Sequence, residues 1–184
     1  MLISEGEILI RLGLAALLGM IVGFERERQN QPAGLRTHAI LAIGSCLAMT
    51  ISINLAVQFV PHVPNGDPAR LAAQVISGIG FLGAGAILRY GTNVKGLTTA
   101  TSLWTVAIVG LAVGAGHYFS AAGTTLALII VLVLLNILEK RAIQTFQVVN
   151  VSVTARENPD LVEQLNRVFL DLKKKVLSTG IDAN

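Results

Sequence analysis

The stretch that decides the fold is residues 118–138, which read YFSAAGTTLALIIVLVLLNIL. It contains no charged residue, and its centre, Leu126–Leu135, is unbroken aliphatic sequence. At a rise of about 1.5 Å per residue, some 20 apolar residues cross a hydrocarbon core of roughly 30 Å. Because backbone hydrogen bonds must be satisfied internally in lipid, the stretch predicts a membrane-spanning helix.

Four further apolar stretches precede it. The five expected spans are Ile8–Phe24, Thr37–Val60, Gln74–Tyr90, Ala100–Gly116 and Tyr118–Leu138. The 184-residue chain is 53% hydrophobic and only 14% charged, whereas about a quarter of the residues of a soluble domain carry charges. The sequence therefore predicts an all-α polytopic membrane protein, with a five-helix transmembrane domain over residues 1–141.

Basic residues are distributed unevenly between the two sets of connecting segments. Seven follow the first, third and fifth spans: Arg26, Arg28, Arg36, Arg89, Lys95, Lys140 and Arg141. Two, Arg11 and Arg70, lie on the other side. The positive-inside rule then predicts an external N-terminus and a cytoplasmic C-terminus. Because these charges are split among short loops, the net charge of +3 does not indicate nucleic-acid binding.

Residues 146–184 differ in character and are predicted to form a short cytoplasmic tail. Val148–Val153 is rich in β-branched residues and predicts a strand. Leu161–Leu172 has one apolar face and predicts a helix, and Val176–Gly180 predicts a second short strand. A β-α-β fragment of this size cannot bury a core alone. We expect it to pack on a second copy, on the membrane domain or on another protein.

Glycine residues at helical spacing are the first group of candidate functional residues. Four lie in the third expected span, at Gly78, Gly80, Gly83 and Gly85. The first and fourth spans hold the pairs Gly19-x-x-x-Gly23 and Gly110-x-x-x-Gly114. Small residues at this spacing let helix backbones approach closely, so a compact bundle explains most of them. Four glycines in eight residues are more than one helix–helix contact needs. We therefore expect the third-span glycines to serve helix packing or to line a substrate path, and we assign Trp104 to the same group.

A polar network is the second candidate. Its members are Glu25, Arg26, Arg36, Thr37, His38, Asp67, Arg70, Gln74, Thr98 and Thr99. In the run Glu25–Arg28, charges one and two positions apart lie on different helix faces, so Glu25 or Arg26 is expected to turn into the bundle and pair there, with Arg36 as one candidate partner. Ion pairs at a membrane boundary are functional candidates, and topology-fixing interfacial charges are the alternative.

Asp67 has two interpretations. It is placed to be the N-cap of the third helix, with Pro68 in the first turn. It is also the only acidic residue of the external side apart from Glu5 and Glu7. Because Mg²⁺ binds through one or two carboxylates while keeping water, Asp67 with Glu5 or Glu7 is a candidate metal site.

Nothing in the sequence indicates an enzyme. It has no nucleophile elbow, P-loop, zinc-ligand spacing or paired catalytic carboxylates. The three histidines are scattered, and the single Cys46 excludes an internal disulfide. We therefore expect no catalytic residues and, apart from Mg²⁺, no cofactor.

Six motifs occur in order along the apolar part of the chain: Gly23–Glu27, Gly34–His38, Asp67–Arg70, Gln74–Gly85, Gly96–Ala100 and Ser102–Trp104. Together they resemble those of the MgtC/SapB family of bacterial inner-membrane proteins. The resemblance covers roughly residues 8–140 and implies five spans with a cytoplasmic C-terminus. It also implies a link to growth in low magnesium, acid stress and survival of pathogens in macrophages. Some members resemble regulators that restrain the ATP synthase, and many carry a βαββαβ, ACT-like domain, of which the tail here resembles half.

These observations favour a non-enzymatic inner-membrane protein that adapts the cell to low magnesium or acid stress by binding membrane partners, including further copies of itself. The alternative is a transporter or channel for Mg²⁺ or another small solute. An offset of 62 residues supports the alternative, because it aligns Gly34–Thr37 with Gly96–Thr99 as in a duplicated transporter. Chance similarity is equally open, since glycine and leucine abound in membrane helices. Five spans also leave little room for a pathway in one protomer.

Overall fold

A computed structural model describes residues 2–62, 66–90 and 93–142, together with Glu163, Arg167 and Phe169. The chain separates into two units, Met1–Gln144 and Thr145–Asn184. In the second unit the three described residues are helical, and Arg167 donates to Glu163 at 2.7 Å. The rest of the β-α-β prediction for residues 146–184 lies outside the described residues.

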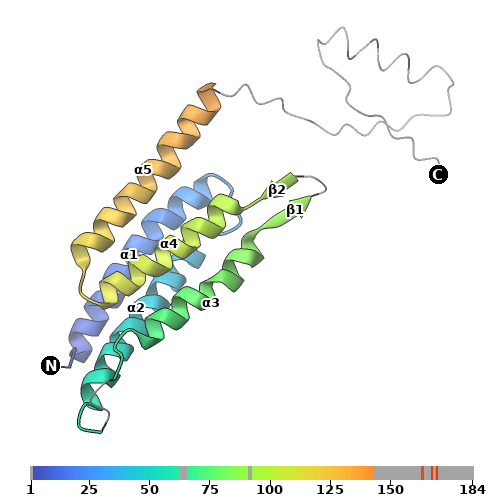
Figure 1. Ribbon diagram of the computed structural model, residues 1–184. Helices are drawn as coiled ribbons and strands as arrows, with labels where there is room; N and C mark the ends of the chain where they lie inside the picture. Colours follow the sequence, from blue (N-terminus) through green and yellow to red (C-terminus); the bar gives the residue numbers. More distant parts are fainter. Residues whose placement is uncertain are drawn as a thin grey trace. The chain divides into compact units, whose positions relative to one another are not determined.

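Five helices and one β-hairpin make up the described part of the first unit (Figure 1). The helices are α1 (Glu5–Arg28), α2 (Leu35–Gln58), α3 (Arg70–Ala86), α4 (Leu97–Gly114) and α5 (Tyr118–Ala142). The hairpin joins α3 to α4 and pairs β1 (Leu88–Tyr90) with antiparallel β2 (Asn93–Lys95). Each of the five predicted stretches therefore contains a helix.

The helices differ in how well they match a bilayer. In the described part of the chain, α1, α2, α4 and α5 are long and apolar enough to cross a membrane. The fifth, α3, is apolar but has only 17 residues, a rise of about 26 Å against a hydrocarbon core of roughly 30 Å. The fold is thus mostly helical, with four to five apolar helices.

The predicted third span, Gln74–Tyr90, was wrong at its end. The helix stops at Ala86, and the backbone turns extended at Ile87 before entering β1. The returning strand brings Gly96 so close to Ala86 that an added Cβ would collide with the Ala86 carbonyl oxygen. Gly96 also has a φ of +92°, which glycine alone adopts without strain. The strictly all-α prediction is corrected accordingly, because a short apolar run does not distinguish helix from strand.

Two tight turns fix how the helices follow one another. After α1, Asn30 takes a left-handed φ of 53°, and the Asn30 and Gln31 amides donate to the Glu27 and Arg26 carbonyls. After α4, Gly116 does the same with a φ of 84°. Both ends are Schellman motifs, which satisfy the last carbonyls of a helix while reversing the chain. They make α1 and α2, and likewise α4 and α5, closely spaced hairpins.

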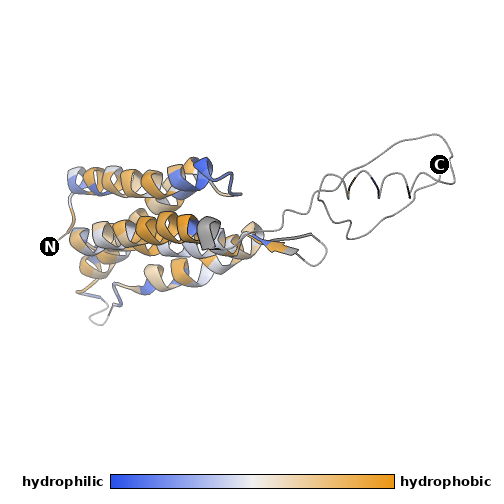
Figure 2. Cartoon of the chain, turned by 90° about the horizontal axis from the view of Figure 1, so that it is seen from above, coloured by the Kyte–Doolittle hydropathy of each residue, from blue (hydrophilic) through white to orange (hydrophobic). Residues whose placement is uncertain are grey.

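The buried core lies where α1, α2, α4 and α5 meet. Its members are Ala15, Leu18, Val22, Ala42, Cys46, Val106, Val109, Val113, Ala121 and Leu132. Large apolar side chains lie outside as well: Phe119 is 97% exposed and Phe81 is 83% exposed. Figure 2 shows hydrophobic residues along the helices and hydrophilic residues gathered toward their ends. An apolar exterior of this kind is expected of helices that face lipid.

Candidate functional site

The G-x-x-x-G pairs of α1 and α4 hold α2 between them at close range. A Cβ placed on Gly19 would lie 2.6 Å from the His38 carbonyl oxygen, and a Cβ on Gly114 would lie 2.6 Å from that of Cys46. Side-chain carbons essentially never approach backbone atoms so closely. These glycines therefore allow α1 and α4 to pack closely against α2 within one chain.

The glycines of α3 have different surroundings. A Cβ placed on Gly78, Gly80 or Gly85 would meet nothing within 4 Å. Only Gly83 has a neighbour, the Cβ of Ala100 at 3.7 Å. Most of α3 is exposed, including Gly78, Gly80 and Gly85. At about 100° per residue, Gly78 and Gly85 share one face of α3, whereas Gly80 lies on nearly the opposite side. Close packing of α3 against the other described helices therefore does not explain these glycines.

A buried ion pair lies at the end of α1. Arg26 donates to Glu25 Oε2 through Nε and Nη2, each at 2.5 Å, and the two side chains are only 5% and 10% exposed. The charge spacing predicts that one of these two side chains turns into the bundle, and in the structure both are buried. The Arg26 guanidinium satisfies only one carboxylate oxygen. Glu25 Oε1 is buried and has no hydrogen-bond partner among the described residues.

His38 links α2 to α4 beside this pair. The ring is fully buried, with Nδ1 at 2.9 Å from the Gly34 carbonyl oxygen and Nε2 at 3.1 Å from Ser102 Oγ. Because a carbonyl only accepts, Nδ1 carries a hydrogen. Ser102 also donates to the Thr99 carbonyl at 2.8 Å. When the ring is neutral, His38 Nε2 and the Thr99 carbonyl thus compete for the single hydroxyl hydrogen of Ser102. In a protonated ring Nε2 would donate to Ser102 Oγ, so that the imidazole, the hydroxyl and the carbonyl would all be hydrogen-bonded.

Two more polar contacts close this end of the bundle. Thr99 is buried and donates to Gln31 Oε1 at 3.2 Å, which ties α4 to the α1–α2 turn. Glu27 Oε2 accepts from the Leu35 amide at 2.9 Å and so satisfies the first turn of α2. Sequence reasoning missed Gln31 and Ser102, because nothing local shows that a loop glutamine or a helix serine faces a neighbouring helix.

The structure brings together only part of the predicted network. Glu25, Arg26, His38 and Thr99 are buried at one end of the bundle. The other members are exposed: Arg36, Thr37, Asp67, Arg70, Gln74 and Thr98. Arg36, proposed as a partner of the buried pair, takes no part in it. Trp104 is 47% exposed on α4.

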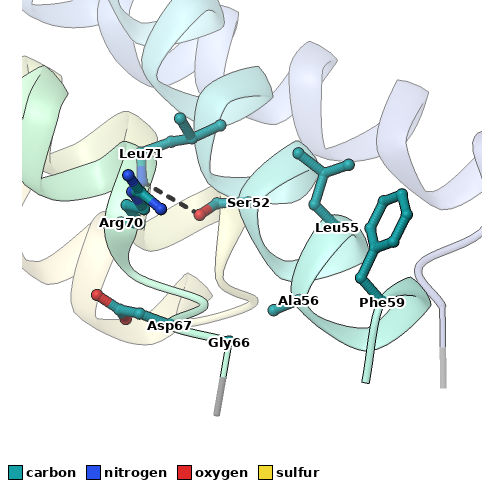
Figure 3. A pocket seen from close by; sticks show the side chains of 8 residues that line it. All are labelled: Ser52, Leu55, Ala56, Phe59, Gly66, Asp67, Arg70 and Leu71. Carbon is teal, nitrogen blue, oxygen red and sulfur yellow. Dashed lines mark hydrogen bonds between the residues drawn. The ribbon is translucent and has the colours of Figure 1, made fainter. Parts of the chain in front are cut away.

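Asp67 and Arg70 lie at the opposite end of α2, beside a pocket between α2 and α3 (Figure 3). The predicted N-cap was wrong by two residues: the cap position is Ala69, and Asp67 Oδ1 accepts from the Ala69 amide at 2.8 Å. The carboxylate thus supports the turn before the helix. Ser52 Oγ accepts from the Leu71 amide at 3.2 Å and joins α3 to α2.

Arg11 was interpreted from the sequence only as a charge that sets membrane orientation. In the structure its side chain is buried and joins α1 to the end of α4. It donates from Nη1 to the Gly114 carbonyl at 2.5 Å and pairs with Glu7 one turn earlier. Its guanidinium also lies 5.8 Å from the centroid of the Tyr118 ring. A cation at a helix C-terminus is favourable, so Arg11 stabilises the α4–α5 turn. The sequence signal was a glutamate four residues before an arginine inside an apolar stretch.

Metal ligands do not cluster in the part of the chain that the structure describes. Within residues 2–62, 66–90 and 93–142, no group of three or more His, Cys, Asp or Glu side chains is placed to hold a metal ion. Glu7 is engaged by Arg11, and Asp67 by the Ala69 amide.

Apolar helices with glycine seams and a buried ion pair define a polytopic helical membrane protein. Comparison with known proteins gives the family, since residues 12–141 match the MgtC family. The chain belongs to the MgtC family. No solved structure matches it.

Three relatives illustrate the match. Protein SapB of Bacillus subtilis (strain 168) is 46% identical over 128 residues, 68% of this chain and 55% of that protein. Protein MgtC of Salmonella paratyphi A (strain ATCC 9150 / SARB42) is 39% identical over 149 residues, 81% and 59% of the two chains. The "Putative magnesium transporter YhiD" of Escherichia coli (strain K12) is 46% identical over 114 residues, 61% and 53% of the two chains. The chain thus spans little more than half the length of these relatives.

Proposed function

We propose that this chain is a non-enzymatic inner-membrane protein that supports adaptation to low magnesium or acid stress by binding other membrane proteins through α3. The observation that carries the proposal is the open space beside Gly78 and Gly85, which share one face of α3. Glycine costs roughly 0.5–1 kcal/mol relative to alanine inside a helix. Two such positions on one face, with no neighbour among the described residues, are explained if a partner helix packs against them.

Other features of α3 support a protein contact. Phe81 is 83% exposed beside the glycines, and Gln74 and Ser77 are exposed one and two turns into the helix. Small residues and hydrogen-bonding side chains are typical of interfaces between membrane helices. A second copy of this chain is the first proposed partner, and the ATP synthase, implied by the family resemblance, is the second.

The alternative is a transporter or channel for Mg²⁺ or another small solute. The buried Glu25–Arg26 pair favours it, because intramembrane charges often mark ion paths. The name of the Escherichia coli relative points in the same direction. Asp67 as a Mg²⁺ ligand is part of this alternative. The orientation with an external N-terminus applies to both proposals.

Growth in low magnesium tests the first proposal. In a host that depends on this protein, Gly78→Leu should abolish growth while the protein still inserts and folds. Gly44→Leu is the matched control, because Gly44 is also exposed with nothing within 4 Å but lies on α2. Equal growth of the two variants would contradict a role for the α3 face.

Flux separates the alternative. Purified protein in proteoliposomes is compared with an Asp67→Asn, Glu25→Gln double variant for Mg²⁺ entry. No flux above empty liposomes, with folding verified by circular dichroism, is the result the regulator proposal expects. Flux that the double variant loses, while its circular dichroism spectrum matches that of the wild type, would establish the transporter instead.

A further inference from the structure

A pocket of about 540 Å³ opens between the end of α2 and the start of α3. Its α2 side is formed by Ser52, Leu55, Ala56 and Phe59, and its α3 side by Gly66, Asp67, Arg70 and Leu71 (Figure 3). The lining is thus mainly apolar, with one carboxylate and one guanidinium at the start of α3. Neither charge takes part in the described network at the other end of the bundle.

The length of α2 indicates that the pocket lies at the level where lipid headgroups begin. The 24 residues of α2 rise by about 36 Å, which exceeds a hydrocarbon core of roughly 30 Å. The last turn of α2, with Phe59 after it, therefore reaches the interfacial layer. The start of α3 is at the same level, because the Leu71 amide bonds to Ser52.

The two charges are available to a ligand. The ion pairs recorded among the described residues are Glu7–Arg11, Glu25–Arg26 and Glu163–Arg167, so Asp67 and Arg70 are not paired with each other. The amides of Ala69, Arg70 and Leu71 are already bonded, to Asp67 and to Ser52. An anion at this helix start would therefore be held by the Arg70 guanidinium. That guanidinium is otherwise unfavourable beside the positive end of α3.

We propose that the pocket binds one phospholipid with a zwitterionic, primary-ammonium headgroup. Arg70 holds the phosphate, and Asp67 holds the ammonium through its free carboxylate oxygen. The upper part of an acyl chain lies against Leu55, Phe59 and Leu71. One anionic and one cationic side chain above an apolar floor match such a lipid in both charge and polarity, whereas an anionic lipid without an amine would place uncompensated negative charge beside Asp67.

Native mass spectrometry of the purified full chain tests the assignment. Protein in detergent is titrated with phosphatidylethanolamine, phosphatidylglycerol or soluble phosphoethanolamine. The wild type should retain phosphatidylethanolamine preferentially. Arg70→Gln should weaken retention of both lipids about tenfold or more. Asp67→Asn should remove the preference for phosphatidylethanolamine while leaving phosphatidylglycerol bound.

Two further variants keep the test independent of folding. Arg36→Gln removes an exposed guanidinium at the other end of α2 and should change nothing. Ala56→Leu narrows the apolar part of the pocket without altering charge, and should weaken both lipids equally. Equal retention of the two lipids by the wild type, with no effect of Arg70→Gln, would overturn the proposal. So would displacement of the lipid by soluble phosphoethanolamine at equal concentration, because the apolar floor would then contribute nothing.

Discussion

Two glycine-rich regions of this molecule look alike in sequence and differ in structure. In α1 and α4, glycines four residues apart touch the backbone of α2, and no side chain fits between them. In α3, Gly78, Gly80 and Gly85 face open space. The same residue type therefore closes the bundle at one place and leaves a helix face open at another.

The two regions are expected to respond differently to substitution, because one is closely packed and the other is exposed. The α1–α2–α4 bundle also contains the buried Glu25–Arg26 pair and the His38–Ser102 contact, so it is the closely packed part of the described chain. The short helix α3 has few buried residues, Ala72 and Ile79. A substitution in the bundle should change the free energy of unfolding, and one on the α3 face should change association.

The largest effect is expected at the buried ion pair. Arg26→Gln leaves the Glu25 carboxylate buried without a counter-charge, which costs about 3–5 kcal/mol of unfolding free energy. Equilibrium unfolding in mixed micelles measures it. The double variant Glu25→Gln, Arg26→Gln removes both charges and should recover most of the loss. An Arg26→Gln protein as stable as the wild type would show that the buried ion pair does not stabilise the bundle.

The next effect compares a closed with an open glycine. Gly110→Ala places a Cβ against the Ala42 carbonyl oxygen, and we expect a loss of about 1–3 kcal/mol from overpacking. Gly44→Ala, at an exposed position of α2, should be neutral or slightly stabilising. The same unfolding measurement applies to both variants. Equal stability of the two would show that the seam between α2 and α4 is looser than described.

A smaller loss is expected from the contact between α2 and α4. Ser102→Ala removes the partner of His38 Nε2 and should cost about 1 kcal/mol of unfolding free energy. Thr105→Ala is the control, since the half-buried Thr105 donates its hydroxyl hydrogen to the Thr101 carbonyl of its own helix. If both substitutions cost the same, the contact between Ser102 and His38 does not stabilise the bundle.

The smallest change in stability is expected on α3. Gly80→Ala meets no neighbour and gains helix propensity, so unfolding should be unchanged or up to about 1 kcal/mol less favourable. Measurement at low protein concentration in detergent isolates the single chain. A loss of more than about 1 kcal/mol would mean that Gly80 already packs within the chain.

The sequence predicted the helices well because a membrane span is a local signal. Its failures concern contacts. The hairpin at Leu88–Lys95 was missed because pairing depends on the returning strand, and Gly96 shows its role only beside Ala86. At the candidate site, the charge spacing predicted that Glu25 or Arg26 turns inward, because that signal is local. The contacts of Ser102 and Gln31 could not be predicted, because they depend on which helix lies opposite.

We expect the face of α3 that carries Gly78 and Gly85 to contact protein, whereas other exposed glycines face lipid. A photo-reactive phenylalanine analogue placed at position 78 or at position 44 in intact membranes tests this directly. Position 78 should give light-dependent adducts with a second copy of this chain, identified by mass, or with a membrane partner. Position 44 should give none. Equal adduct yields from the two positions, or lipid adducts alone from position 78, would contradict a protein contact at this face.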